Sequence, residues 1–145
     1  MNILVINGPN LNLLGIREPE IYGTDTLEEL MMWLETNPVS SDHSFKFYQT
    51  NHEGEIIDTI QDERHWAKGI LINPGAFTHY SYAIRDAIVS VAIPTVEVHL
   101  SDIHNREEFR QISVISPVCI NQVSGLGKDS YIKGLKLLIK YLDAL

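Results

Sequence analysis

Short apolar runs rich in β-branched residues alternate with amphipathic stretches along the chain, and this alternation constrains the fold more than any other feature. Several runs are apolar throughout, which is typical of parallel strands that are buried on both faces. The stretches between them repeat apolar residues at helical spacing. We predict strands at Asn2–Ile6, Phe45–Thr50, Gly69–Ile72, Thr95–His99 and Val118–Val123.

Helices are predicted between and after these strands. The first begins at the Thr26–Glu29 capping-box spacing and carries its apolar residues on one face. Strand–helix alternation favours a parallel sheet covered on both faces, so we predict a flavodoxin-like doubly wound α/β fold with five strands. No repeat or linker interrupts the pattern, and residues 1–145 are expected to form a single domain. The other helices are predicted at Glu55–Trp66, Ser81–Val91 and Ser130–Leu142.

Overall charge and cysteine content argue against several classes of protein. The formal net charge of −8 disfavours nucleic acid as a partner, because phosphate binding needs concentrated Lys and Arg. The single cysteine, Cys119, cannot build a disulfide framework or a thiolate metal cluster. No apolar run approaches the roughly 18 residues of a membrane span, and Met1–Ile6 lacks the basic start of a signal peptide. We therefore expect a cytoplasmic protein with neither a nucleic-acid nor a membrane partner.

Polar residues follow three of the predicted strands where those strands end. In a doubly wound sheet, ligands bind beyond the carboxyl ends of the strands, near the point where the strand order reverses. Asn7–Asn10 follows the first strand, Asn73–Gly75 follows the third, and His99–Ser101 lies at the end of the fourth. The segment Asn7–Gly23 is also long for a strand–helix connection, and such loops often serve as lids. We expect a small-molecule site at this edge.

Two residue pairs near that edge suit acid–base chemistry. A guanidinium beside a phenol favours the ionised phenolate, so Arg17 would make Tyr22 a usable base. The period of two in a strand puts Glu97 on the same side as His99, where a carboxylate would orient the imidazole as a general acid. The residues alone leave two plainer interpretations open: an ordinary surface loop and a structural His–Glu pair.

Other polar residues have plain structural explanations. His79 is predicted at the start of the third helix with Thr78 as its cap, where histidine is more often a local hydrogen-bonding residue. Arg106 and Arg110 are four apart in a predicted short helix and would share a face, either ion-paired in solvent or binding substrate oxygens. No metal is predicted, because the other histidines lack metal-ligand spacing. These are His43, His52, His65 and His104.

The order of these motifs resembles the type II dehydroquinases, a family of 3-dehydroquinate dehydratases. The resemblance covers almost the whole chain, and so many ordered motifs leave little room for coincidence. The matching segments are Asn7–Gly15, Arg17–Pro19, Ile21–Gly23, Asn51–Glu55, Asn73–Ala76, Thr78–His79, Arg85–Ala87, Glu97–Ser101, Ile103–His104 and Arg106–Arg110.

This resemblance implies a cofactor-free hydro-lyase that converts 3-dehydroquinate into 3-dehydroshikimate through an enolate, in the shikimate pathway of aromatic amino acid biosynthesis. Tyr22, kept ionised by Arg17, would remove the proton next to the ketone. His99, oriented by Glu97, would protonate the departing hydroxyl. Asn10 would stabilise the enolate through an ordered water. The family also implies a homododecamer of four trimers, in which a neighbouring subunit supplies Asp86. The implied substrate-binding residues are Asn73, His79, Asp86, Leu100, Ser101 and Arg110.

Two other functions are compatible with the fold. A flavodoxin-like binding or signalling module without catalysis would not need the polar set described above. A dehydratase that forms a Schiff base would need a lysine beside that set. The lysines fall on surface or helix patterns, and none ends an apolar strand near the polar residues: Lys46, Lys68, Lys128, Lys133, Lys136 and Lys140.

Overall fold

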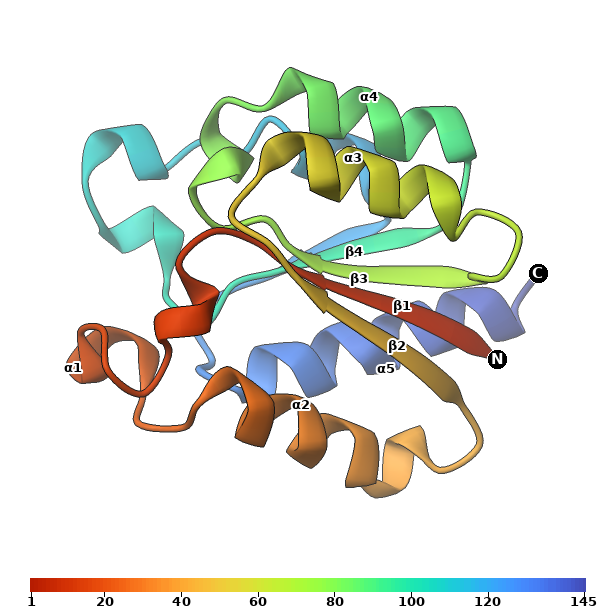
Figure 1. Cartoon of the computed structure of the whole chain (residues 1–145), viewed down its shortest axis with the longest axis horizontal. Helices are drawn as coiled ribbons and strands as arrows, with labels where there is room; N and C mark the ends of the chain where they lie inside the picture. Colours follow the sequence, from red (N-terminus) through yellow and green to blue (C-terminus); the bar gives the residue numbers. More distant parts are fainter.

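A parallel five-stranded sheet runs through the centre of the computed structural model, which describes residues 1–145 (Figure 1). Its strand order is β2-β1-β3-β4-β5, so the order reverses between β1 and β3. This arrangement confirms the predicted flavodoxin-like fold. The strands are β1 (Asn2–Asn7), β2 (Ser44–Gln49), β3 (Gly69–Asn73), β4 (Thr95–Val98) and β5 (Asn121–Val123).

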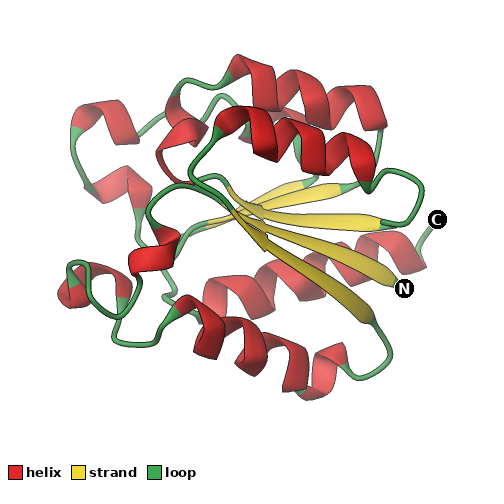
Figure 2. Ribbon diagram, viewed as in Figure 1, coloured by secondary structure: helices red, strands yellow, loops and turns green.

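Helices cover both faces of the sheet (Figure 2). Alternate residues of β1 explain why: Ile3 and Val5 belong to one buried cluster, whereas Leu4 and Ile6 belong to the other. The first cluster receives the apolar faces of α2 (Leu27–Thr36) and α5 (Asp129–Asp143), and the second receives those of α3 (Glu53–Asp62) and α4 (Tyr82–Val91). The shorter helices are α1 (Pro19–Tyr22), η1 (Leu11–Leu13), η2 (Pro38–Ser40), η3 (Gly75–His79), η4 (Ile103–Asn105), η5 (Glu108–Arg110) and η6 (Ser116–Val118).

Serine and threonine caps fix where two of the helices begin. Thr26 accepts the backbone N–H of Glu29 at 3.2 Å and donates to the Glu29 carboxylate at 3.1 Å. This contact bears out the predicted start of α2. Ser81 accepts the N–H of Ile84 at 3.1 Å and caps α4. The position of Ser81 corrects the prediction for His79, which lies in η3 ahead of the cap.

Three predicted elements differ from the structure. The fifth strand is Asn121–Val123 rather than Val118–Val123, because Val118 belongs to η6 and the N–H groups of Val118 and Cys119 bond the Ile115 and Ser116 carbonyls at 3.0 and 3.1 Å instead of a neighbouring strand. Residues 106–110 do not form one helix: Arg106 follows η4, and Arg110 ends η5. The helix predicted at Glu55–Trp66 after the second strand also shifts, since α3 begins at Glu53 and ends at Asp62.

The loops after β1 and β3 lie in close contact at the strand-order reversal. Gly8 donates its N–H to the Asn73 carbonyl at 2.8 Å, and a Cβ on Gly8 would lie 2.7 Å from Pro74. Gly75 has φ +58°, and a Cβ there would meet the Pro9 carbonyl at 3.1 Å. Side chains at either glycine would separate the two loops. No helix is both long enough and apolar enough to cross a membrane.

Candidate active site

A cavity of about 130 Å³ lies beyond the carboxyl ends of β1, β3 and β4, where the fold places ligands. A wider cavity of about 690 Å³ lies beside it, and the two share Tyr22, Leu100, Ser101 and Arg106. The smaller cavity gathers most of the predicted polar groups and is the candidate site. From the predicted set it contains Asn10, Arg17, Tyr22, Asn73, His79, His99, Leu100, Ser101 and Arg110.

Positive charge dominates this cavity although the chain as a whole carries a formal charge of −8. Arg17, Arg106 and Arg110 line it, and no Asp or Glu does. Guanidinium groups bind carboxylates and other oxyanions through paired N–H donors. The local charge therefore suits a small anionic ligand and overcomes the unfavourable overall charge at short range.

Tyr22 lies between two guanidinium groups. Arg106 donates from Nη1 to the Tyr22 hydroxyl at 2.7 Å and approaches the Ser101 hydroxyl at 3.4 Å. The Arg17 guanidinium carbon lies 4.7 Å from the centroid of the Tyr22 ring, in cation–π contact. From the sequence we expected Arg17 as the cation at Tyr22, and for Arg106 we left open an ion pair in solvent or the binding of substrate oxygens. Both arginines contact the phenol, and Arg106 is the one that reaches its oxygen.

The predicted pairing of Glu97 with His99 is present. His99 Nε2 donates to Glu97 Oε1 at 2.6 Å, with the Glu97 side chain fully buried and that of His99 6% exposed. Glu97 does not line the cavity but lies behind His99 in β4, while His99 follows the strand and reaches the cavity. The carboxylate can therefore orient the imidazole without touching a ligand.

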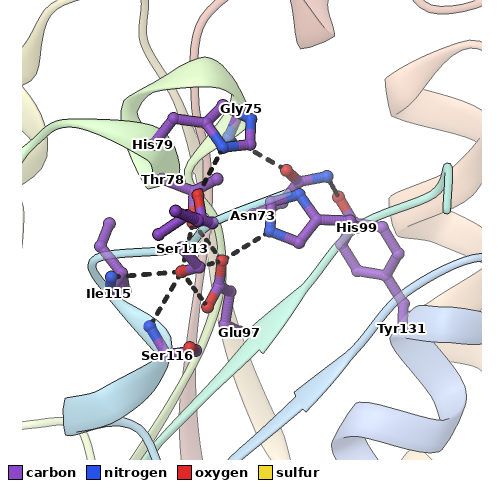
Figure 3. Close-up of polar contacts among 11 residues, drawn as sticks. Asn73, Gly75, Thr78, His79, Glu97, His99, Ser113, Ile115, Ser116 and Tyr131 are labelled. Carbon is purple, nitrogen blue, oxygen red and sulfur yellow. Dashed lines mark hydrogen bonds and ion pairs between the residues drawn. The ribbon is translucent and has the colours of Figure 1, made fainter. Parts of the chain in front are cut away.

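Two hydroxyl groups also bind the Glu97 carboxylate (Figure 3). Thr78 donates to Oε1, and the Ser113 hydroxyl lies 3.0 Å from Oε1 and 2.9 Å from Oε2. Burial alone would raise the pKa of Glu97, but the hydrogen bond and positive charge of His99, with the two hydroxyl donors, outweigh it and lower that pKa. Glu97 is thus held as a carboxylate.

His79 projects into the cavity from η3 and is held as a neutral imidazole. Burial lowers its pKa, and positive charge at His99 and Arg110 acts in the same direction, against the opposing hydrogen bond to Ile112. In that hydrogen bond His79 Nδ1 donates to the Ile112 carbonyl at 2.8 Å. Nε2 of a neutral His79 is then an acceptor that suits a hydroxyl group of a ligand.

A buried amide–phenol chain fixes the orientation of Asn73 at the end of β3 (Figure 3). Asn73 donates from Nδ2 to the Tyr131 hydroxyl at 2.9 Å and accepts the Gly75 N–H at 3.1 Å. The Tyr131 hydroxyl donates in turn to Asn7 at 2.6 Å. Burial raises the pKa of Tyr131, so this phenol stays protonated. The chain of contacts presents the Asn73 amide to the cavity in one orientation.

Asn10 is held from a neighbouring loop. Its backbone has φ 69°, a left-handed conformation that Asn tolerates, and its N–H donates to the Asn51 side chain at 3.0 Å. Asn51 also accepts from Gln49 at 3.1 Å, and Gln49 bonds the Gly8 carbonyl at 3.2 Å. The loop after β2 thereby supports the loop that carries Asn10.

Two predicted site residues do not line the cavity, Glu97 and Asp86. Glu97 bonds His99 from behind, whereas Asp86 is exposed on α4 and does not line either cavity described above. The predicted site omitted Thr78 and Ser113, and it gave Arg106 only as an alternative to a surface ion pair. The Arg106–Arg110 spacing signalled two nearby cations, whereas isolated hydroxyl residues in loops gave no signal. No group of three or more His, Cys, Asp or Glu residues lies close enough together to hold a metal ion.

The fold and cavity define a flavodoxin-like α/β protein with a cationic small-molecule site that holds an imidazole–carboxylate pair. Residues 1–139 match the family described as dehydroquinase class II. The chain therefore belongs to the class II dehydroquinases.

Individual relatives agree with this assignment. The chain is 56% identical to a 3-dehydroquinate dehydratase of Carboxydothermus hydrogenoformans over 142 residues, which cover 98% of this chain and 92% of that one. It is 53% identical to a 3-dehydroquinate dehydratase of Trichodesmium erythraeum over 141 residues, with coverage of 97% and 94%. The crystal structure of type II dehydroquinase from Butyrivibrio crossotus superimposes with a TM-score of 0.93 at 52% identity, covering 96% of this chain and 97% of that chain.

Proposed function

We propose that this protein is a type II 3-dehydroquinate dehydratase of the shikimate pathway, a hydro-lyase that converts 3-dehydroquinate into 3-dehydroshikimate. The observation that carries the proposal is the pairing of two proton-transfer groups in one cationic cavity. Tyr22 has a guanidinium at its oxygen, and His99 has a buried carboxylate at its ring. A binding module without catalysis needs neither arrangement, so the site favours an enzyme.

Tyr22 acts as the base in this proposal. A charged donor at the phenol oxygen stabilises the phenolate, and Arg106 occupies that place while Arg17 adds positive charge over the ring. The phenolate removes a proton from the carbon next to the ketone, and the electron pair of the broken C–H bond forms an enolate. Asn10 lies in the cavity to stabilise the enolate oxygen through an ordered water.

His99 acts as the acid that completes the elimination. The enolate collapses to form the new C=C bond as the C–O bond of the tertiary hydroxyl breaks, and His99 protonates that leaving oxygen to give water. The proton taken by Tyr22 and the proton lost by His99 are exchanged with solvent, so the net reaction releases one water. Glu97 stabilises the imidazolium before transfer and keeps the ring oriented afterwards.

Substrate binding uses the remaining cavity groups. Asn73 and the backbone N–H groups of Leu100 and Ser101 receive the substrate carboxylate, supported by the arginine charge. Neutral His79 accepts a hydrogen bond from a ring hydroxyl, and Arg110 donates to another. Arg110 is already oriented by an ion pair with Glu107, which also lowers the pKa of that carboxyl group. The mechanism needs no cofactor and no metal.

We further propose that residues 1–145 act as one catalytic domain in the cytoplasm, assembled as a homododecamer of four trimers. Asp86 supports the assembly, because it is exposed on α4 and lines neither of the two cavities described above. Tyr80 and Tyr82, near the start of α4, are 59% and 62% exposed and offer apolar surface for a neighbouring subunit. Sedimentation of the active enzyme tests this part, and a fully active monomer would exclude a shared site.

The decisive experiment follows the absorbance of the conjugated enone as the protein acts on 3-dehydroquinate. We expect product formation by the wild type and loss of most activity in Tyr22→Phe and His99→Ala. EDTA should leave turnover unchanged, and borohydride added with substrate should not inactivate the enzyme. Absence of enone would refute the function, whereas substrate-dependent inactivation by borohydride would replace the enolate route with a Schiff base.

A further inference from the structure

Ser113 occupies an unusual hydrogen-bonding position behind the proposed acid (Figure 3). Its oxygen accepts the backbone N–H groups of Ser116 at 2.9 Å and Ile115 at 3.2 Å. A hydroxyl oxygen accepts two hydrogen bonds and donates one. Both acceptor positions of Ser113 are therefore occupied. Its single proton has two acceptors within reach, the Thr78 oxygen at 2.9 Å and the Glu97 carboxylate at 2.9 and 3.0 Å, and the charged carboxylate is the stronger of the two.

The same count fixes the proton of Thr78. The Thr78 and Ser113 oxygens lie 2.9 Å apart, but Ser113 has no acceptor position left for Thr78. The Thr78 proton must therefore also go to Glu97, with which Thr78 makes a direct contact. With His99, three donors surround a carboxyl group that is fully buried. A proton on Glu97 would face these donors, so Glu97 can only accept.

We propose that Ser113 and Thr78 are positioning residues that, through Glu97, fix which nitrogen of His99 delivers its proton. Because Glu97 only accepts, His99 Nε2 keeps its hydrogen whether the ring is neutral or charged. Nδ1 is then the nitrogen that gains and loses a proton. Nδ1 has no hydrogen-bond partner in the protein, and Figure 3 shows it on the side of Asn73, another cavity residue. This inference rests on the proposed role of His99 as acid.

Removing either hydroxyl group should change the orientation of His99 and leave the cavity lining in place. Neither Ser113 nor Thr78 lines the cavity, so neither touches substrate. Without the Ser113 donor, the Glu97 carboxylate is free to turn and the two N–H groups of the 115–116 segment lose their acceptor. His99 would then sample ring orientations in which Nδ1 no longer faces the substrate. We expect kcat to fall while KM changes little.

A double-mutant cycle on the complete enzyme tests the inference, with kcat and KM measured for 3-dehydroquinate. Ser113→Ala should lower kcat roughly tenfold to a hundredfold, the usual cost of removing a partner that orients a functional histidine. In a His99→Ala background the same change should alter kcat less than about twofold, because its effect passes through His99. Ser113→Thr, which keeps the hydroxyl, should recover most of the lost kcat.

Two further variants keep the test decisive. Thr78→Val removes the other donor at similar size, and its effect should likewise vanish in the His99→Ala background; it replaces Ser113→Ala if that protein fails to fold. Ser40→Ala is the matched control: Ser40 is buried and donates to the Leu34 carbonyl at 2.6 Å, remote from the cavity. We expect it to lower the melting temperature and leave kcat unchanged.

Each outcome has one meaning. Equal losses of kcat from Ser113→Ala in the wild-type and His99→Ala backgrounds would assign Ser113 a structural role only and overturn the inference. Wild-type kcat in both Ser113→Ala and Thr78→Val would overturn it as well. A wild-type protein that forms no enone would instead refute the proposed function, independently of these variants.

Discussion

On the acid side of the cavity (Thr78, Glu97, His99 and Ser113), the central carboxylate is fully buried, whereas the base side (Arg17, Tyr22 and Arg106) is built from partly exposed residues. The acid side joins β4 to the 113–116 segment through hydrogen bonds to fixed donors. The base side depends on one hydrogen bond and a cation–π contact, in segments outside the sheet.

Because of this difference, the two sides of the cavity should contribute unequally to the stability of the fold. Buried, fully bonded polar groups contribute to the stability of the fold and resist rearrangement. A half-buried phenol held by long arginine side chains contributes little to stability but can move with its loop. We conclude that the acid is held by the core of the fold, whereas the base is held by side chains of segments outside the sheet.

Replacing each proposed catalytic group should produce the largest effects. Tyr22→Phe and His99→Ala should each lower kcat by roughly 10²–10⁴, the usual contribution of a positioned acid or base. Their stabilities should diverge: His99→Ala leaves Glu97 buried without its charged partner and should lose roughly 3 kcal/mol, whereas Tyr22→Phe should lose less than about 1 kcal/mol. Enzyme assays and urea unfolding of both variants measure this. Equal losses of stability would remove the distinction between the two sides.

The two arginines of the base side should differ in importance. Arg106 bonds the phenol oxygen, so Arg106→Gln should lower kcat at pH 7 roughly a hundredfold, and Arg17→Gln roughly tenfold. Arg17→Lys should lie between wild type and Arg17→Gln, since lysine keeps charge but not the planar group. Steady-state kcat and KM at pH 7 check this order, with Tyr22→Phe as the control. A raised KM with an unchanged kcat would make either arginine a substrate ligand only.

Acid should destabilise the protein through Glu97. Its pKa in the folded protein lies below the ordinary value of 4.5. Such a group stabilises the fold above the unfolded pKa, and that contribution is lost as the pH falls through the folded pKa. Glu97→Gln should therefore be less stable than wild type by about 2 kcal/mol at pH 7. The gap should close below pH 4.5. Urea unfolding across pH 3 to 7 measures it, and a gap that is constant with pH would contradict a buried carboxylate.

The smallest effect should come from the hydroxyl behind Asn73. Tyr131→Phe removes a donor to Asn7 and an acceptor for Asn73 without changing the ring. We expect a loss of about 1 kcal/mol, because the two amides keep other contacts. KM should rise severalfold with kcat nearly unchanged, since Asn73 is proposed to bind rather than react. Calorimetry and steady-state kinetics decide this, and a large fall in kcat would place Asn73 in the chemistry.

Local patterns predicted the sheet and the edge at which the cavity lies. The runs around Ile3–Ile6 and Gly69–Ile72 identify buried parallel strands, and the polar residues that follow them must meet at the same end of the sheet. The period of two also predicted the Glu97–His99 contact within one strand end. Each of these inferences needs only neighbouring residues or the geometry of regular elements.

Contacts that involve the irregular segments could not be predicted from such patterns. Arg106 and Tyr22 are separated by 84 residues, and Thr78 and Glu97 by 19, so their meeting depends on how irregular segments pack. The prediction for Val118–Val123 was wrong at its start, because apolar Val118 packs against a core cluster without joining the ladder. Apolar character showed that this residue is partly buried, but not which backbone hydrogen bonds it makes.

The close contact of Gly8 with Pro74, and of Gly75 with Pro9, has a consequence for anyone who wishes to change which ring acids the enzyme accepts. These contacts join the loop that carries Asn10 to the end of β3 that carries Asn73. A substitution at either glycine would therefore shift both asparagines at once. Such changes would spoil the common reaction centre instead of altering selectivity. Directed evolution of substrate range should leave Gly8 and Gly75 unchanged. It should diversify Ala76 and Ile103, which line the cavity without polar side-chain contacts.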